Sequence, residues 1–129
     1  MLLTLKEWHR KTFAVQLPGA GGGRPRAELA QGLISGPFGI YVGTPFRVGP
    51  PEVGAKSFTL IHLPSQIAKL TLPQQKLCRQ AAEEFAACDL AWESAWPFDI
   101  TGPKEELAKA QEIYRRWKSF GVRKSWGER

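Results

Sequence analysis

Residues Phe58–Leu70 read FTLIHLPSQIAKL, and this stretch decides the fold prediction because it defines a pair of strands. Two runs rich in strand-forming residues, Phe58–Leu63 and Gln66–Leu70, flank the dipeptide Pro64-Ser65. Strand formers on both sides of a short, proline-containing break are typical of a β-hairpin. The sequence therefore predicts an antiparallel hairpin, and the other elements can be placed outward from it.

A helix is predicted directly after the hairpin, from Thr71 to about Cys88. Its start has a threonine three residues before Gln74 and a proline in the first turn, which is the pattern of a capping box. Apolar residues then recur at spacings of three and four, as they do on one face of a helix. This predicted apolar stripe consists of Leu77, Cys78, Ala81, Phe85 and Cys88.

A second helix is predicted over Thr101–Phe120, with Gly121 as its terminator. Glutamates near its start and basic residues near its end complement a helix dipole. The predicted buried stripe consists of Leu107, Ala110, Tyr114 and Trp117. Between the helices, Asp89–Ile100 is predicted to be an irregular segment pinned over the core by its large rings. These rings are Trp92, Trp96 and Phe98.

The part of the chain before the hairpin contains shorter elements. Residues 2–17 are predicted to form one or two short strands, and the glycine-rich Gly19–Arg26 a flexible loop. A short helix is predicted over Ala27–Ile34, which precedes Gly36-Pro37. A strand is predicted over Phe38–Val42, and Gly43–Gly54, with three prolines and three glycines, is predicted to be a loop.

The length of 129 residues fits one domain that spans the whole chain, with a mobile basic tail over residues 119–129. Apolar residues make up 43% of the chain, which is a globular composition. The elements together predict an α+β fold in which a small antiparallel sheet of about three to five short strands packs against two helices. The pattern leaves the oligomeric state open.

The cysteines and the N-terminal sequence bear on the location of the protein. Cys78 and Cys88 lie ten positions apart in one predicted helix, or roughly 15 Å along its axis. A disulfide needs Cα atoms within about 7 Å, so the sequence predicts reduced thiols and a cytoplasmic protein. The chain begins without an apolar run of signal-peptide length, and no stretch approaches the roughly 18 apolar residues of a membrane span. No membrane association is therefore predicted.

Motifs for catalysis, cofactors and metals do not emerge from the sequence. The cluster Gly19–Gly23 lacks the Gly-Lys-Ser or Gly-Lys-Thr ending of a phosphate-binding loop. Histidines, cysteines and aspartates do not occur at metal-ligand spacings, and both cysteines lie on the apolar stripe. The sequence therefore predicts a protein that is not an enzyme and has no cofactor and no metal site.

The basic end of the chain is its strongest functional signal. The segment Arg115–Arg129 carries six positive charges and one negative charge, and the whole chain has a formal net charge of +6. Lysine and arginine neutralise phosphates and a flat indole can stack on bases, so this composition favours nucleic acid. The predicted nucleic-acid-binding residues are Arg24, Arg26, Arg115, Arg116, Lys118, Arg123, Lys124 and Trp126. The same residues also fit a solvated helix end, with Trp117 in the core and a frayed tail.

A protein partner, in particular an acidic one, is the alternative function. The chain would then be a protein–protein interaction module, for instance an inhibitor of a host defence or regulatory complex. Its surplus of aromatic residues would supply the anchors of such an interface. These candidate anchors are Trp8, Phe46, Trp92, Trp96 and Trp126. Phosphate-driven binding weakens steeply with salt, whereas an aromatic interface changes modestly, so salt separates the alternatives.

The layout over Phe38–Trp92 resembles small uncharacterised proteins of phages and other mobile elements, which implies an origin but no site residues. The order of three strands and a helix over Phe38–Cys88 is also similar to AP2-like and integrase arm-type DNA-binding domains. In those domains the sheet lies in the major groove, so the similarity implies DNA binding through the sheet. Here the sheet region offers Lys56 and Lys69, with Arg47 in the preceding loop.

Overall fold

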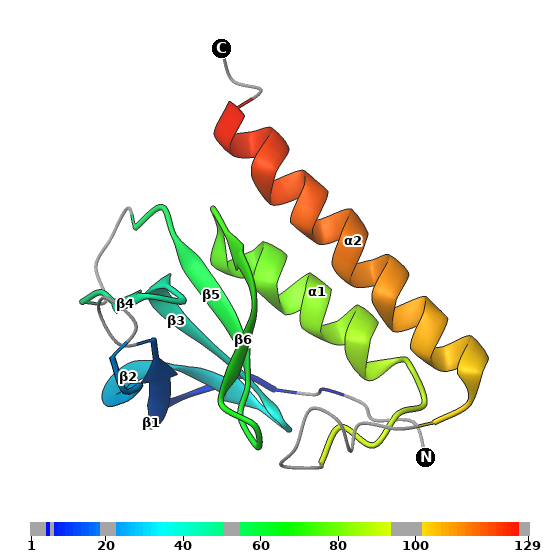
Figure 1. The fold of residues 1–129 in the computed structure, drawn as a ribbon, viewed down its shortest axis with the longest axis horizontal. Helices are drawn as coiled ribbons and strands as arrows, with labels where there is room; N and C mark the ends of the chain where they lie inside the picture. The colour runs from blue at the N-terminus through cyan, green and yellow to red at the C-terminus, as the bar shows by residue number, and fades with distance from the viewer. Residues whose placement is uncertain (1–4, 6, 19–22, 51–54, 94–101, 127–129) are drawn as a thin grey trace.

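A computed structural model of the chain describes residues 5, 7–18, 23–50, 55–93 and 102–126, and for Ile67 and residues 120–126 it describes the backbone alone. One antiparallel sheet carries two helices on the same side (Figure 1). The β1–β2 hairpin lies at the edge of the sheet away from the helices. The predicted α+β class is confirmed, and the described residues form a sheet of six strands, more than the predicted three to five.

The sheet is a meander in which, apart from the short β4, each strand pairs with the next along the chain. Its order is β1-β2-β3-β5-β6, and β4 pairs with the end of β3 beside this path. The strands are β1 (His9–Leu17), β2 (Arg26–Ser35), β3 (Phe38–Thr44), β4 (Arg47–Val48), β5 (Phe58–His62) and β6 (Ile67–Leu72). The predicted hairpin is therefore confirmed as β5 and β6, and the loop predicted over Gly43–Gly54 contains β4.

The helix predicted over Ala27–Ile34 is wrong, because these residues belong to strand β2. Strand β2 pairs with β1 from Arg26 to Ile34 and with β3 from Gly32 to Ser35. Helix propensity differs between ordinary residues by less than about 1 kcal/mol each, so pairing on both sides outweighs it. The Gly36-Pro37 turn then joins β2 to β3, with Gly36 at φ 57°, as a tight hairpin turn requires.

Both predicted helices are present with different ends: α1 runs from Gln75 to Ala86 and α2 from Lys104 to Trp126. The capping box at Thr71 is wrong, because Thr71 is still in β6 and its hydroxyl lies 2.9 Å from the Thr59 hydroxyl. The predicted stop at Gly121 is also wrong, since α2 continues through it. One glycine inside a helix costs only about 1 kcal/mol.

The main core lies between the sheet and the helices. Side chains alternate along a strand, so Phe38 and Ile40 of β3 and Leu60 of β5 face α1. The partly buried stripe of α2 consists of Leu107, Ala110, Ile113 and Trp117. Ile113 thus takes the place predicted for Tyr114, whose surface is 37% exposed.

A second apolar cluster fills the opposite face of the sheet, on which the described part of the chain places no helix. Its buried members are Val15, Leu17, Ala30, Tyr41 and Ile61. The sheet curls over this cluster, because the ring of Phe13 in β1 lies 6.4 Å from that of Tyr41 in β3, although β2 separates the two strands. This face is therefore occupied by the protein's own side chains.

The two cysteines are free and buried, which agrees with the predicted unpaired thiols. Burial raises the pKa of the Cys78 thiol to about 12, and its Sγ contacts the Phe58 carbonyl. Such a thiol is a core residue rather than a nucleophile. Within the described residues, neither helix is both long and apolar enough to cross a bilayer.

Candidate nucleic-acid interface

The structure separates the predicted binding residues into two groups. Arg24 and Arg26 lie at the entry to β2, where Arg26 is 3.7 Å from the Glu28 carboxylate. The other predicted residues belong to α2, which packs against β6 at the opposite edge of the sheet. One continuous surface that joins both groups is therefore not formed by the described residues, and the α2 group is the larger.

The cations of α2 point in different directions. Arg116 pairs with Glu84 of α1, and the indole of Trp117 donates to the same carboxylate at 2.9 Å. Arg115 pairs with Glu112 at 2.8 Å, and the Lys118 ammonium lies 5.5 Å from the centre of the Tyr114 ring. Arg123, Lys124 and Trp126 continue α2, but their side chains lie outside the described part of the chain.

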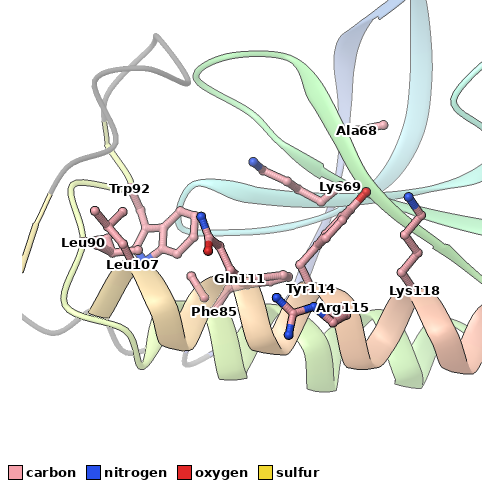
Figure 2. Close-up of a pocket in the computed structure, with 11 residues that line it drawn as sticks. Ala68, Lys69, Phe85, Leu90, Trp92, Leu107, Gln111, Tyr114, Arg115 and Lys118 are labelled. Atoms are coloured by element: carbon pink, nitrogen blue, oxygen red, sulfur yellow. The ribbon is translucent and has the colours of Figure 1, made fainter. Parts of the chain in front are cut away.

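A groove between β6 and α2 brings several of these groups together, with a volume of about 680 Å³ (Figure 2). Its inner wall is apolar and includes Phe85, Leu90, Trp92 and Leu107. Its cations are Lys69 from β6 and Arg115 and Lys118 from α2. The described residues that line it include no aspartate or glutamate. We call this site the α2–β6 groove.

Lys69 enters the groove because of an irregularity in the sheet. Leu60 pairs with Leu70 and Ile61 with Ala68, so Lys69 is an extra residue in β6, a β-bulge. Burial lowers the pKa of the Lys69 ammonium. Among the described residues no carboxylate lies within ion-pair distance of Lys69, so a cation is held partly out of water without a partner there. Such a group favours an anionic ligand.

Trp92 forms a fixed part of the apolar wall. Its indole donates to the Cys88 carbonyl at 3.1 Å, and its own carbonyl accepts from His62 Nε2 at 2.5 Å. Its ring packs on Phe38 at 5.4 Å and on Phe85 at 5.8 Å. This confirms that the irregular segment is pinned at Trp92, while Trp96 and Phe98 lie outside the described residues.

His62 connects this wall to the hairpin turn. Because Nε2 donates to the Trp92 carbonyl, Nδ1 of the neutral ring accepts from the Ser65 hydroxyl at 2.8 Å. The side chain is fully buried, and this burial lowers the pKa of His62. The histidine is therefore a neutral structural group that holds Trp92.

The lowered pKa of His62 predicts a pH-dependent stability. As the pH falls, the histidine of the unfolded chain binds its proton near pH 6.5, whereas the folded histidine binds it only at a lower pH. The contribution of His62 to the free energy of unfolding is therefore complete above pH 6.5 and declines as the pH falls below it. We expect the free energy of unfolding to fall by at most about 1.4 kcal/mol per pH unit. Urea denaturation between pH 7.5 and 5.5 measures the decline. His62→Gln should remove this component, and His9→Gln, which leaves His62 in place, should keep it.

Two polar contacts hold α2 in position beside the sheet. The Asp89 amide donates to Glu106 at 2.9 Å, which lowers the pKa of the Glu106 carboxyl and ties the segment after α1 to the start of α2. Farther along, Glu84 accepts from Arg116 and Trp117. The wall formed by α2 is therefore fixed from both ends of the groove.

The groove has the groups of an anion-binding surface. Three cations beside an apolar wall can hold an anion that carries a flat apolar part, and the exposed Tyr114 ring adds a stacking surface. The described residues form no cluster of three or more histidine, cysteine, aspartate or glutamate side chains that could hold a metal ion.

Sequence reasoning identified Arg115 and Lys118 but missed two members of the groove. Lys69 was noted only as one of a few sheet cations, and Tyr114 was assigned to the buried stripe. The sequence signal for Lys69 was a single cation among the strand-forming residues Gln66–Leu70. The side of the sheet that its side chain faces depends on the bulge, which the sequence does not reveal. Comparison of the chain with protein-family models, with curated proteins and with solved structures found no match in any of the three.

Proposed function

We propose that this chain is a non-enzymatic nucleic-acid-binding protein whose contact surface is the α2–β6 groove. The observation that carries the proposal is a groove whose described lining has three cations and no carboxylate: Lys69, Lys118 and Arg115, the last of which also pairs with Glu112 outside the lining. Phosphate contacts of this kind position a strand by charge. Positive charge on the whole chain, +6, would favour the first encounter with a polyanion.

The exposed aromatic surface supports the same function. Tyr114 is an exposed aromatic residue on a helix whose other exposed residues are mostly polar, and its ring lies next to the Lys118 ammonium. An aromatic ring next to a cation matches the alternation of base and phosphate along a nucleic-acid strand. Arg123 and Lys124 follow in the sequence of the same helix, and we propose that they also contact phosphate.

A protein partner remains the second candidate, and one observation favours it. Phe46 is 68% exposed in the turn between β3 and β4, and Leu29 of β2 is 73% exposed. Of the other predicted anchors, Trp92 is buried and Trp8 packs against the core, which leaves Phe46 as the anchor among described side chains. Binding through Phe46 would respond weakly to salt.

Removing two groove cations should weaken nucleic-acid binding. We expect native protein to bind labelled mixed-sequence oligonucleotides with a dissociation constant of about 1–100 μM near physiological salt, and more tightly at low salt. The double variant Lys69→Gln/Lys118→Gln should bind about 10-fold or more weakly, and the slope of log affinity against log salt should shrink by about two. Fluorescence anisotropy over a salt series measures both quantities.

The matched control is Arg47→Gln/Lys56→Gln, which removes two exposed cations outside the groove and lowers the net charge equally. It should change the affinity by less than the groove variant does. An equal loss in both double variants would mean that net charge alone drives binding. No binding by native protein at low salt would overturn the proposal and turn attention to protein partners at Phe46.

A further inference from the structure

The α2–β6 groove has more apolar surface than phosphate binding needs. Phe85, Leu90 and Trp92 form its inner wall, and each is less than 10% exposed. Figure 2 shows Tyr114 rising from α2 toward β6 and Lys69 reaching into the space between these elements. The accessible apolar lining beside this wall consists of the partly buried Leu107 and Ala110 and the exposed Tyr114, and a ligand that touched only the cations would leave it in contact with water.

From this chemistry we infer that the groove takes single-stranded nucleic acid and seats at least one unpaired base against Tyr114 and the apolar wall. This inference rests on the proposed function and adds the form of nucleic acid that is recognised. In a duplex, neighbouring base pairs cover the faces of the bases, so only the phosphates could reach the groove. In a single strand the faces are free to stack on aromatic side chains.

The size and rigidity of the groove support an inserted base. Its volume of about 680 Å³ falls within the range of roughly 300–1,000 Å³ that is usual for sites that enclose small organic molecules. Trp92 is held by two hydrogen bonds and three neighbouring rings, so this wall does not have to be ordered when the ligand binds. Lys69 and Lys118 lie on the two sides of Tyr114 (Figure 2), where they can contact the phosphates that flank the inserted base.

The test compares four ligands of equal length with the full chain: single-stranded DNA, single-stranded RNA, the DNA duplex, and a DNA strand whose central nucleotides are abasic. We expect both single strands to bind about 5- to 100-fold more tightly than the duplex and the abasic strand. Tyr114→Ala should weaken single-strand binding by a similar factor and leave duplex binding unchanged. Phe46→Ala, which removes an exposed ring outside the groove, is the matched control.

The possible results separate this inference from the proposed function. If duplex and abasic strands bind as tightly as the single strand, with a steep salt dependence, the proposed function stands and the seated base is overturned. If Tyr114→Ala and Phe46→Ala both leave single-strand binding unchanged, the groove does not hold the base. If no ligand binds, both proposals fail together.

Discussion

The variant Phe38→Ala should have a free energy of unfolding about 3–5 kcal/mol lower than that of the native protein. Phe38 is fully buried at the centre of the main core, and its ring has three ring neighbours. The ring of Trp92 lies at 5.4 Å, that of His62 at 6.1 Å and that of Phe85 at 6.4 Å. Truncation leaves a cavity that these rings cannot fill, because hydrogen bonds hold His62 and Trp92 in place.

Urea denaturation followed by circular dichroism measures this loss. Phe46→Ala removes the same ring from a position that is 68% exposed and should stay within about 0.5 kcal/mol of the native protein. A loss below about 1.5 kcal/mol for Phe38→Ala would contradict the description of a tightly packed centre. The same variant should also loosen the apolar wall of the α2–β6 groove, since the ring of Trp92 packs on the ring of Phe38.

The variant Gly32→Ala should lower the free energy of unfolding by at least about 2 kcal/mol. A Cβ at this position would lie 2.0 Å from the Ile40 carbonyl oxygen and 3.1 Å from the ring of Phe13. The oxygen belongs to the backbone of β3, so it cannot turn aside as a flexible side chain could. The β2–β3 pairing, or the curl that brings Phe13 over the sheet, would have to open.

Gly49→Ala is the matched control for this steric argument. Its new Cβ would meet Val42 at 3.4 Å, which is ordinary contact, so its stability should stay within about 1 kcal/mol of the native value. The measurement is again urea denaturation of both variants under one set of conditions. Equal stability of the two variants would show that β2 and β3 do not approach each other as closely at Gly32 as described.

The sequence predicted the elements whose signals are local. The hairpin at Phe58–Leu70 and the two helices have periodic apolar patterns, and their own residues suffice to define them. The segment Ala27–Ile34 was assigned wrongly because its alanines, glutamate and leucine fit a helix, whereas its structure is determined by pairing with β1 and β3. Pairing partners that lie along other parts of the chain cannot be read from the segment itself.

Some features of the candidate site could likewise be predicted from the local sequence, and others depend on distant residues. The basic character of α2 was evident from the sequence, but the direction of each cation was not. Arg116 points to Glu84, which is 32 positions away along the chain, while Lys118 faces the groove. The wall at Trp92 depends on a hydrogen bond to His62 over 30 positions. The phage or mobile-element origin and the resemblance to sheet-type DNA-binding domains remain predictions.

The bulge in β6 means that the length of this strand, as well as the identity of residue 69, controls the charge of the groove. In an uninterrupted ladder the side chains alternate, and position 69 would face the cluster under the curled sheet. Deleting one residue between Ile67 and Leu70 would therefore take the ammonium out of the groove without any change in the helix. Such a deletion should therefore weaken anion binding as Lys69→Gln does, while Arg115 and Lys118 stay in place on the helix.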